Sequence, residues 1–241
     1  MKKSNIFLIG AFSLALCWSL LIGWFAASAI NNYIQGKDPY FARSQHQYLE
    51  SHKKSFPSPK GELCISGEGT MILSILPGKQ LDVLSDPRTW SCVYTDLKNG
   101  KSMISFKKLR ESGYNEPVTI MLPEVSSISF DNFSGVTLKG LNRKEIHFQC
   151  KRVHSFISSD CKMGTLVLDF PGNKDYQDIA IDKSNQIGAF IASVKGAGTI
   201  RLETAGQMKN QVSLSDSVKV EATSEIIKKL SIGPESRVLN K

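Results

Sequence analysis

The sequence predicts an all-β protein, a β-solenoid that follows a single N-terminal transmembrane helix. Three observations support this fold class. Short apolar-x-apolar triplets recur between residues 118 and 223, turn-forming residues separate them, and an uncharged stretch of 25 residues lies near the N-terminus. Strand-sized triplets that return about every 8–12 residues are typical of all-β repeat architectures.

The triplets define the expected core. Alternation over three residues points two side chains inward and one outward, as in a half-buried strand. One such strand buries little apolar surface by itself, so successive coils must stack to complete a core, as they do in a solenoid. The eight triplets are Ile128-Ser-Phe130, Val136-Thr-Leu138, Ile146-His-Phe148, Leu166-Val-Leu168, Ile179-Ala-Ile181, Ile200-Arg-Leu202, Val212-Ser-Leu214 and Val218-Lys-Val220.

Residues 6–30 form the expected membrane segment. They carry no charge and are long enough to cross a hydrocarbon core as a helix. Lys2 and Lys3 favour a cytoplasmic N-terminus, which predicts a single-pass protein with its C-terminal domain on the extracytoplasmic side. The alternative is a signal peptide cleaved after Ala27-Ser28-Ala29, a small-x-small site, which would release a secreted or surface protein.

Three further parts follow the membrane segment. Residues 31–61 form a polar juxtamembrane stalk, in which Asp38-Pro39 predicts the start of a short helix over Tyr40 to Lys53. Residues 62–224 form the β-solenoid domain. Residues 225–241 form a C-terminal cap, because a repeat array needs its last open edge covered.

The solenoid domain is expected to open with antiparallel strands between Glu62 and Leu122. Asn99-Gly100 is the favoured pair for a tight hairpin, since both of its residues adopt positive φ easily. The other expected turns are Gly67-Glu-Gly69, Pro77-Gly78 and Asp86-Pro87, and Pro123 ends the last of these strands.

The order of these motifs resembles that of a known family, the auto-transporter adhesin head domain, also called the head GIN domain. The matching segments are Ser66-Gly67-Glu68-Gly69, Pro77-Gly78, Asn99-Gly100-Lys101-Ser102-Met103-Ile104, Val118-Thr119-Ile120-Met121-Leu122-Pro123, Phe133-Ser134-Gly135-Val136-Thr137-Leu138-Lys139-Gly140-Leu141 and Lys195-Gly196-Ala197-Gly198-Thr199-Ile200. The resemblance covers roughly Glu62 to Ala222. It implies a right-handed β-helix or β-roll in the envelope of a bacterium, here anchored in the inner membrane with the domain in the periplasm. Residues 142–160 contain less glycine than the family pattern, and residues 171–178 form an unusual insertion.

The charge balance argues against a nucleic-acid partner. The formal charge is +8, but Lys2 and Lys3 belong to the leader, which leaves 28 basic and 22 acidic residues spread over the rest of the chain. No block of arginine and lysine with interleaved aromatic residues is present, as nucleic-acid binding would require. A mildly basic surface suits anionic lipid or acidic glycan instead.

Four cysteines follow the membrane segment, an even number in an oxidising compartment. Sequence order suggests the disulfide pairs Cys64–Cys92 and Cys150–Cys161, although four cysteines allow three pairings. The alternative is four buried, unpaired thiols. No Cys-x2–4-Cys spacing is present for zinc.

A metal site at His147, Cys150 and His154 is not expected. Ile146 and Phe148 point inward, so His147 points to solvent, and residues 147 and 154 would face opposite sides of a continuous strand. We expect no cofactor.

An acidic cluster is the one candidate for catalysis, since β-solenoids also serve as polysaccharide lyases and hydrolases. Its members are Asp169, Asp175, Asp178 and Asp182. Glycoside chemistry requires two carboxylates across a groove, but the composition around Pro171 to Asp175 is equally typical of an exposed turn. No nucleophile elbow, Walker loop or dinucleotide fingerprint occurs.

The function predicted from the sequence is therefore non-enzymatic. Outward positions such as Ser129, Thr137, Ser213 and Lys219 form a polar strand face. Such a face suits the recognition of a glycan or an envelope protein, in an adhesin-like way. The alternatives are a carbohydrate-active enzyme that uses the acidic cluster, and a purely structural envelope protein.

Overall fold

The computed structural model describes residues 18, 53–59, 61–86, 89–96, 101–109, 118–204, 206, 209–215, 217–232 and 238–240. The chain divides into two compact units, Met1–Ser51 and His52–Lys241. The expected membrane segment lies outside the described residues apart from Trp18, and the expected stalk helix lies outside them apart from Lys53. Within the part that is described, no helix is long and apolar enough to cross a membrane.

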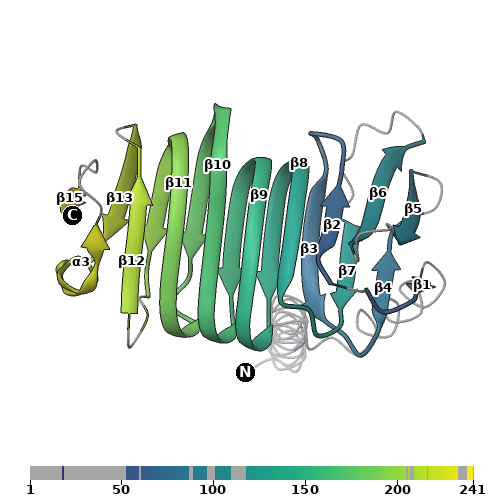
Figure 1. Ribbon diagram of the computed structural model, residues 1–241, viewed down its shortest axis with the longest axis horizontal. Helices are drawn as coiled ribbons and strands as arrows, with labels where there is room; N and C mark the ends of the chain where they lie inside the picture. The colour runs from purple at the N-terminus through teal and green to yellow at the C-terminus, as the bar shows by residue number, and fades with distance from the viewer. Residues whose placement is uncertain are drawn as a thin grey trace, which may run out of the picture. The chain divides into compact units, whose positions relative to one another are not determined.

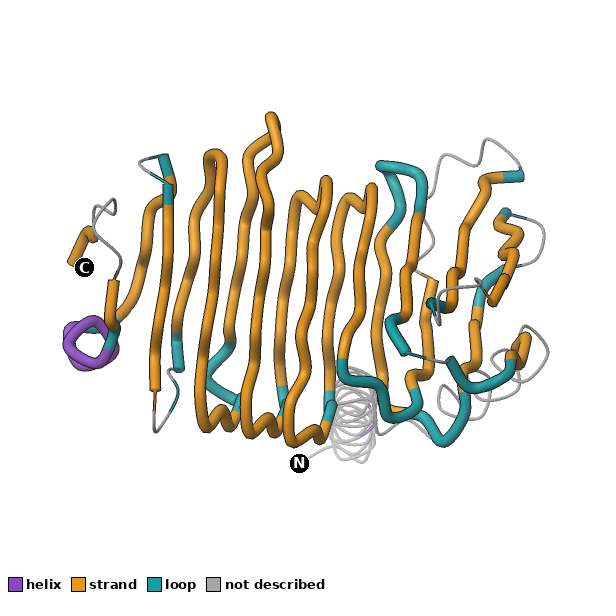
Figure 2. The backbone as a smooth tube through the Cα atoms, in the orientation of Figure 1, coloured by secondary structure: helices purple, strands orange, loops and turns teal. Residues whose placement is uncertain are grey.

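Four long strands form the body of the second unit: β8 (Ser127–Lys139), β9 (Asn142–Ser159), β10 (Lys162–Ile181) and β11 (Gln186–Leu202). Each strand runs along a first leg, turns a corner and returns along a second leg (Figures 1 and 2). Neighbouring strands pair in parallel along both legs. The prediction of an all-β solenoid is confirmed, and the four long strands form about 4 of its turns.

The core consists of inward columns that cross the coils in register. Both apolar residues of all eight triplets are buried, which confirms the predicted core pattern. A first-leg column contains Leu63, Ile128, Phe148, Leu168, Ala192 and Val212. The matching second-leg column contains Leu73, Val136, Phe156, Ile179, Ile200 and Val220.

Aromatic rings join the first coils to one another. The centroid of the Phe148 ring lies 5.8 Å from that of Phe130 and 5.8 Å from that of Phe156, and Phe156 lies 5.9 Å from Phe170. All four side chains are fully buried. Contacts at this separation add to the stability from apolar burial.

Seven shorter strands precede β8: β1 (Lys53–Phe56), β2 (Leu63–Ser66), β3 (Ile72–Pro77), β4 (Leu81–Leu84), β5 (Trp90–Asp96), β6 (Ser102–Lys108) and β7 (Val118–Leu122). The pairs β5–β6 and β4–β7 are antiparallel, as expected.

The prediction of an antiparallel arrangement is wrong for β2 and β3. These strands pair in parallel with the two legs of β8 and form the coil before it. The reason lies at the corner between them, where the Gly67 amide donates to the Asp131 carbonyl (3.0 Å) and the Asn132 side chain donates to the Gly67 carbonyl (3.0 Å). This corner therefore stacks on that of β8, and β2–β3 continues the solenoid.

Strand β1 lies in the region that the sequence assigns to the stalk. It pairs antiparallel with β4, and the Phe56 ring lies 5.2 Å from the Tyr94 ring. One aromatic residue in a polar segment is a weak strand signal, so the sequence does not reveal this pairing. The folded unit thus begins before residue 62.

The C-terminal end contains β12 (Lys209–Leu214), β13 (Val218–Ala222), helix α3 (Ser224–Lys229), β14 (Ser231–Ile232) and β15 (Val238–Asn240). Ile226 of α3 is buried and joins the core. Strand β14 pairs with β12 and β15 pairs with β13, so strand pairing continues beyond residue 224, the expected end of the solenoid.

Candidate functional site

The first legs of the coils display a column of polar side chains on their outer face. Because the coils pair in register, equivalent outward residues lie beside one another at the strand spacing of about 4.8 Å. We call this column the first face, and its members are Ser129, Gln149, Asp169, Ser193 and Ser213. The expected outward positions of Ser129 and Ser213 are confirmed.

The second legs display a more highly charged outer face. We call it the second face, and its two columns are Gly135, Ser155, Asp178, Thr199 and Lys219, and Thr137, Ile157, Ala180, Arg201 and Glu221. Arg201 forms an ion pair with Asp178. The Lys219 ammonium lies 2.7 Å from a Glu221 carboxylate oxygen. Most of the charge on this face is thus paired within it.

The four predicted acidic residues do not face one common surface. Asp169 lies on the first face, where it accepts a hydrogen bond of 3.4 Å from the Gln149 side chain, and Asp178 lies on the second face. Asp175 is exposed at the corner between the two legs of β10. Two carboxylates that act on one glycosidic bond must face each other across about 5–10 Å. The positions of Asp169 and Asp178 do not provide that arrangement.

Asp182 has a local structural role in the turn after β10. Its carboxylate accepts a hydrogen bond of 2.8 Å from the Ser184 backbone amide, and this bond lowers the pKa of the Asp182 carboxyl. The same turn contains buried Asn185, whose side-chain amide donates to the carbonyls of Ser158 (2.7 Å) and Asp182 (2.8 Å). The Asp182 carboxylate therefore stabilises the turn through a hydrogen bond to its backbone, as aspartate often does in turns.

All four cysteines of the solenoid domain are free thiols, so neither suggested disulfide is present. Cys64 and Cys92 lie on β2 and β5, on opposite sides of β6. Two strand spacings separate them by at least about 9 Å, which is beyond disulfide reach. Burial raises the pKa of the Cys150 thiol well above its usual value and also raises that of Cys161, which makes both poor nucleophiles.

His147 and His154 are half-buried. His147 occupies an outward position of the first legs, beside Ser127 and Val167, as expected. Among the described residues, no group of three or more histidine, cysteine, aspartate or glutamate side chains is arranged to hold a metal ion.

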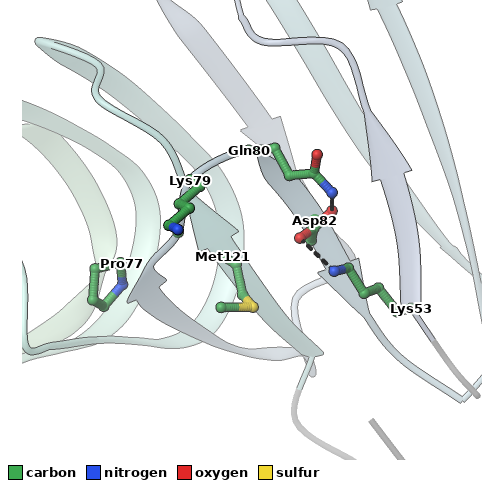
Figure 3. Close-up of a pocket in the computed structure, with 7 residues that line it drawn as sticks. Lys53, Pro77, Lys79, Gln80, Asp82 and Met121 are labelled. Carbon is green, nitrogen blue, oxygen red and sulfur yellow. Dashed lines mark hydrogen bonds and ion pairs between the residues drawn. The ribbon is translucent and has the colours of Figure 1, made fainter. Parts of the chain in front are cut away.

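A pocket of about 670 Å³ lies at the N-terminal end of the solenoid, beside the β3–β4 turn (Figure 3). Pro77 and Met121 form part of its apolar wall, and Lys53, Lys79, Gln80 and Asp82 supply polar groups. We call it the entrance pocket. Its size lies within the range of small-ligand sites.

Asp82 is the buried polar centre of the entrance pocket. Its carboxylate lies 3.0 Å from the Lys53 ammonium and accepts a hydrogen bond of 2.9 Å from Gln80. Burial raises the pKa of this carboxyl, but hydrogen bonds from Ser55, Lys53 and Gln80 outweigh burial and lower it overall. Asp82 therefore stays ionised and joins β1 to β4.

The sequence does not identify the entrance pocket. Leu81-Asp-Val83 predicts a strand with a polar outward residue, and nothing in it indicates that Asp82 is covered. Lys53 covers it from β1, a strand assigned to the stalk. The sequence signal for this region is the pair of turn residues Pro77-Gly78, which connects β3 to β4 across the intervening strand β7.

Comparison with known proteins finds no matching family and no similar curated protein. Among solved structures, a candidate adhesin from Bacteroides fragilis is 12% identical, with a TM-score of 0.37, over 78% of this chain and 94% of that one. A candidate cell adhesion protein from Clostridium sporogenes is 14% identical, with a TM-score of 0.29, over 78% of this chain and 98% of that one. At these TM-scores the likeness decides neither family nor function, so the head GIN assignment stays a prediction.

Proposed function

We propose that this chain is a non-enzymatic binding module of the bacterial envelope, which recognises a glycan or a protein partner through the outer faces of its coils. Residues 6–30 hold it in the inner membrane, and the solenoid projects into the periplasm. Recognition is shallow and multivalent, because each coil contributes one or two side chains to a continuous surface. The module uses no cofactor.

The observation that supports this proposal is the in-register first face. Five coils present Ser129, Gln149, Asp169, Ser193 and Ser213 side by side. The serine hydroxyls and the Gln149 amide offer both hydrogen-bond donors and acceptors, and a short serine side chain has little conformational entropy to lose when it binds. A regular array of this kind suits a partner that is itself a repeating polymer.

The test uses the full-length chain in detergent micelles against a panel of immobilised bacterial and host polysaccharides. Retained protein and released reducing sugar are both measured. We expect retention without release. Release of sugar would overturn the proposal in favour of a carbohydrate-active enzyme, and the absence of retention on every polysaccharide would exclude glycan recognition.

A variant pair localises the binding surface. Ser213→Arg places a bulky charge on the exposed end of the first face, and Ser217→Arg places the same charge on an exposed turn outside it. We expect Ser213→Arg to weaken binding roughly tenfold, which corresponds to about 1.4 kcal/mol, and Ser217→Arg to leave it unchanged. Equal affinities of the two variants would place the binding surface elsewhere.

A further inference from the structure

A second hollow, of about 320 Å³, lies at the start of β9, β10 and β11 and is unrelated to the acidic cluster and the entrance pocket. Its wall contains three basic side chains, two side-chain amides and no carboxylate. The residues concerned are Arg143, Lys144, Lys162, Asn142 and Gln186. We call it the basic hollow.

Close stacking of the coils brings these residues together. Asn142, Lys162 and Gln186 occupy one register position on three successive coils. Two positions further along, the backbone of Gly164 packs so closely on Lys144 that a Cβ at Gly164 would overlap the Lys144 carbonyl oxygen. Because Gly164 has no side chain, the space beside the exposed Lys144 and Lys162 side chains stays open.

Hydrogen bonds to the backbone hold Arg143 in the wall of the hollow. Its two terminal nitrogens donate to the carbonyls of Asn142 (2.8 Å), Leu122 (3.1 Å) and Pro123 (2.9 Å). Its Nε is buried and has no hydrogen-bond partner. Three neutral carbonyls orient the guanidinium but do not neutralise it, so its positive charge persists at the hollow.

The charge of the basic hollow is not compensated within the described part of the chain. The carboxylates of Glu145 and Asp160 lie within two positions of Lys144 and Lys162 in the sequence, and neither lines the hollow. Among the described residues, Arg143, Lys144 and Lys162 take part in no ion pair. Three other exposed cations, Arg152, Arg201 and Lys219, each contact a carboxylate. Like charges without a counter-charge favour an anion.

The residues that line the basic hollow favour one class of anionic partner over the others. No aromatic side chain lines the hollow, whereas single-stranded nucleic acid is bound by stacking on such rings. Three basic residues are fewer than the clusters of about four to eight that recognise anionic membranes. Asn142 and Gln186 supply donors and acceptors suited to sugar hydroxyls, and the volume fits a small ligand or one unit of a polymer.

We propose that the basic hollow binds the carboxylate or sulfate group of an acidic glycan. Lys144 and Lys162 form charge-assisted hydrogen bonds with the anionic oxygens, and Asn142 and Gln186 contact neighbouring hydroxyls. The inference rests on the proposed binding function and narrows its partner to an acidic polysaccharide. The hollow anchors the charged unit, while the rest of the polymer extends over the coils.

The experiment measures binding of polygalacturonate, and of dextran as its neutral counterpart, to the full-length chain in detergent. The test variant is the double substitution Lys144→Gln and Lys162→Gln. The control is Lys139→Gln and Lys183→Gln, which removes the same charge from exposed lysines outside the hollow. All four lysines are exposed, so both variants should keep the wild-type melting temperature.

We expect tighter binding of polygalacturonate than of dextran, weakened by salt. The test variant should lose about tenfold or more in affinity, and the control should stay within about twofold of wild type. Equal loss in both variants, or equal affinity for the two polysaccharides, would overturn the assignment. Polyglutamate, duplex DNA or phosphatidylglycerol vesicles that bind more tightly than polygalacturonate through the same lysines would overturn it in favour of that partner.

The two proposals fail in distinguishable ways. If neutral glycans bind and polygalacturonate does not, the basic hollow is excluded and the general binding function stands. If neither neutral nor acidic polysaccharides bind, both proposals of glycan recognition are excluded.

Discussion

At the scale of single residues, Asp82 shows how one covered carboxylate stabilises the N-terminal end of the solenoid. We expect Asp82→Asn to lower the free energy of unfolding by about 1–3 kcal/mol at pH 7, because it removes the ion pair with Lys53 and alters the hydrogen bond with Gln80. Chemical denaturation of the wild type and the variant measures the difference.

The contribution of Asp82 to stability depends on pH. Its pKa is lower in the folded protein than in the unfolded chain. Its contribution is therefore fully present above the unfolded pKa of about 3.9 and is lost as pH falls through the folded pKa. The gap between wild type and variant should shrink over that acidic range. A gap that does not change with pH would contradict the role of the ionised carboxylate.

Gly198 tests how closely neighbouring coils approach each other. A Cβ at this position would overlap the Gln177 carbonyl oxygen on the adjacent coil, whereas a Cβ at Gly135 would have its nearest neighbours at 3.9 Å. We expect Gly198→Ala to destabilise the protein by about 1–3 kcal/mol and Gly135→Ala to have a much smaller effect. Thermal unfolding of the two variants compares them directly, and equal melting temperatures would refute the steric argument.

At the scale of elements, the sequence predicts a strand reliably where the strand belongs to the regular triplet repeat, and poorly where it does not. In each triplet of β8–β13 the first and third residues are apolar and point inward. The repeat is therefore visible in the sequence without any knowledge of strand pairing. Strand β1 has one aromatic residue and a partner about thirty positions away. Its existence depends on that partner, which no local pattern reveals.

Phe148 tests the contribution of the stacked core. Its side chain is fully buried between Phe130 and Phe156, so we expect Phe148→Ala to cost about 3–5 kcal/mol of unfolding free energy. Ile157→Ala is the matched control on the outer face, where the side chain is 41% exposed, and it should change stability by less than about 0.5 kcal/mol. Urea denaturation curves provide both values. Similar losses would show that inward and outward positions are not energetically distinct.

At the scale of the whole molecule, the predicted anchor sets the location of the binding surface. We expect the intact chain to remain in the membrane fraction of bacterial cells after an alkaline carbonate wash, because 25 uncharged residues partition into the bilayer as a helix. Fractionation followed by mass spectrometry of the N-terminus measures this. A soluble protein that begins near Ile30 would favour the cleaved signal peptide instead.

The candidate sites show why surface chemistry is harder to predict than the core. The sequence grouped Asp169 and Asp178 because they are close along the chain, but the corner of β10 places them on different faces. Conversely, Lys144 and Lys162 are eighteen positions apart and line the same hollow, because they lie on the adjacent strands β9 and β10. The number of residues in each coil decides which side chains lie side by side on the solenoid surface. That number is known only when the pairing register of the strands is known.

By itself the sequence determined the all-β class, the stacked coils and the identity of the buried residues, because burial of alternating apolar side chains is a local property that repeats. Only the tertiary structure decided that β2 and β3 join the solenoid, that Asp82 is covered by Lys53, and that the four cysteines of the solenoid domain are free thiols. It also decided which charges share a surface. These features depend on contacts between distant parts of the chain, and such contacts follow from strand pairing and coil register rather than from composition or spacing.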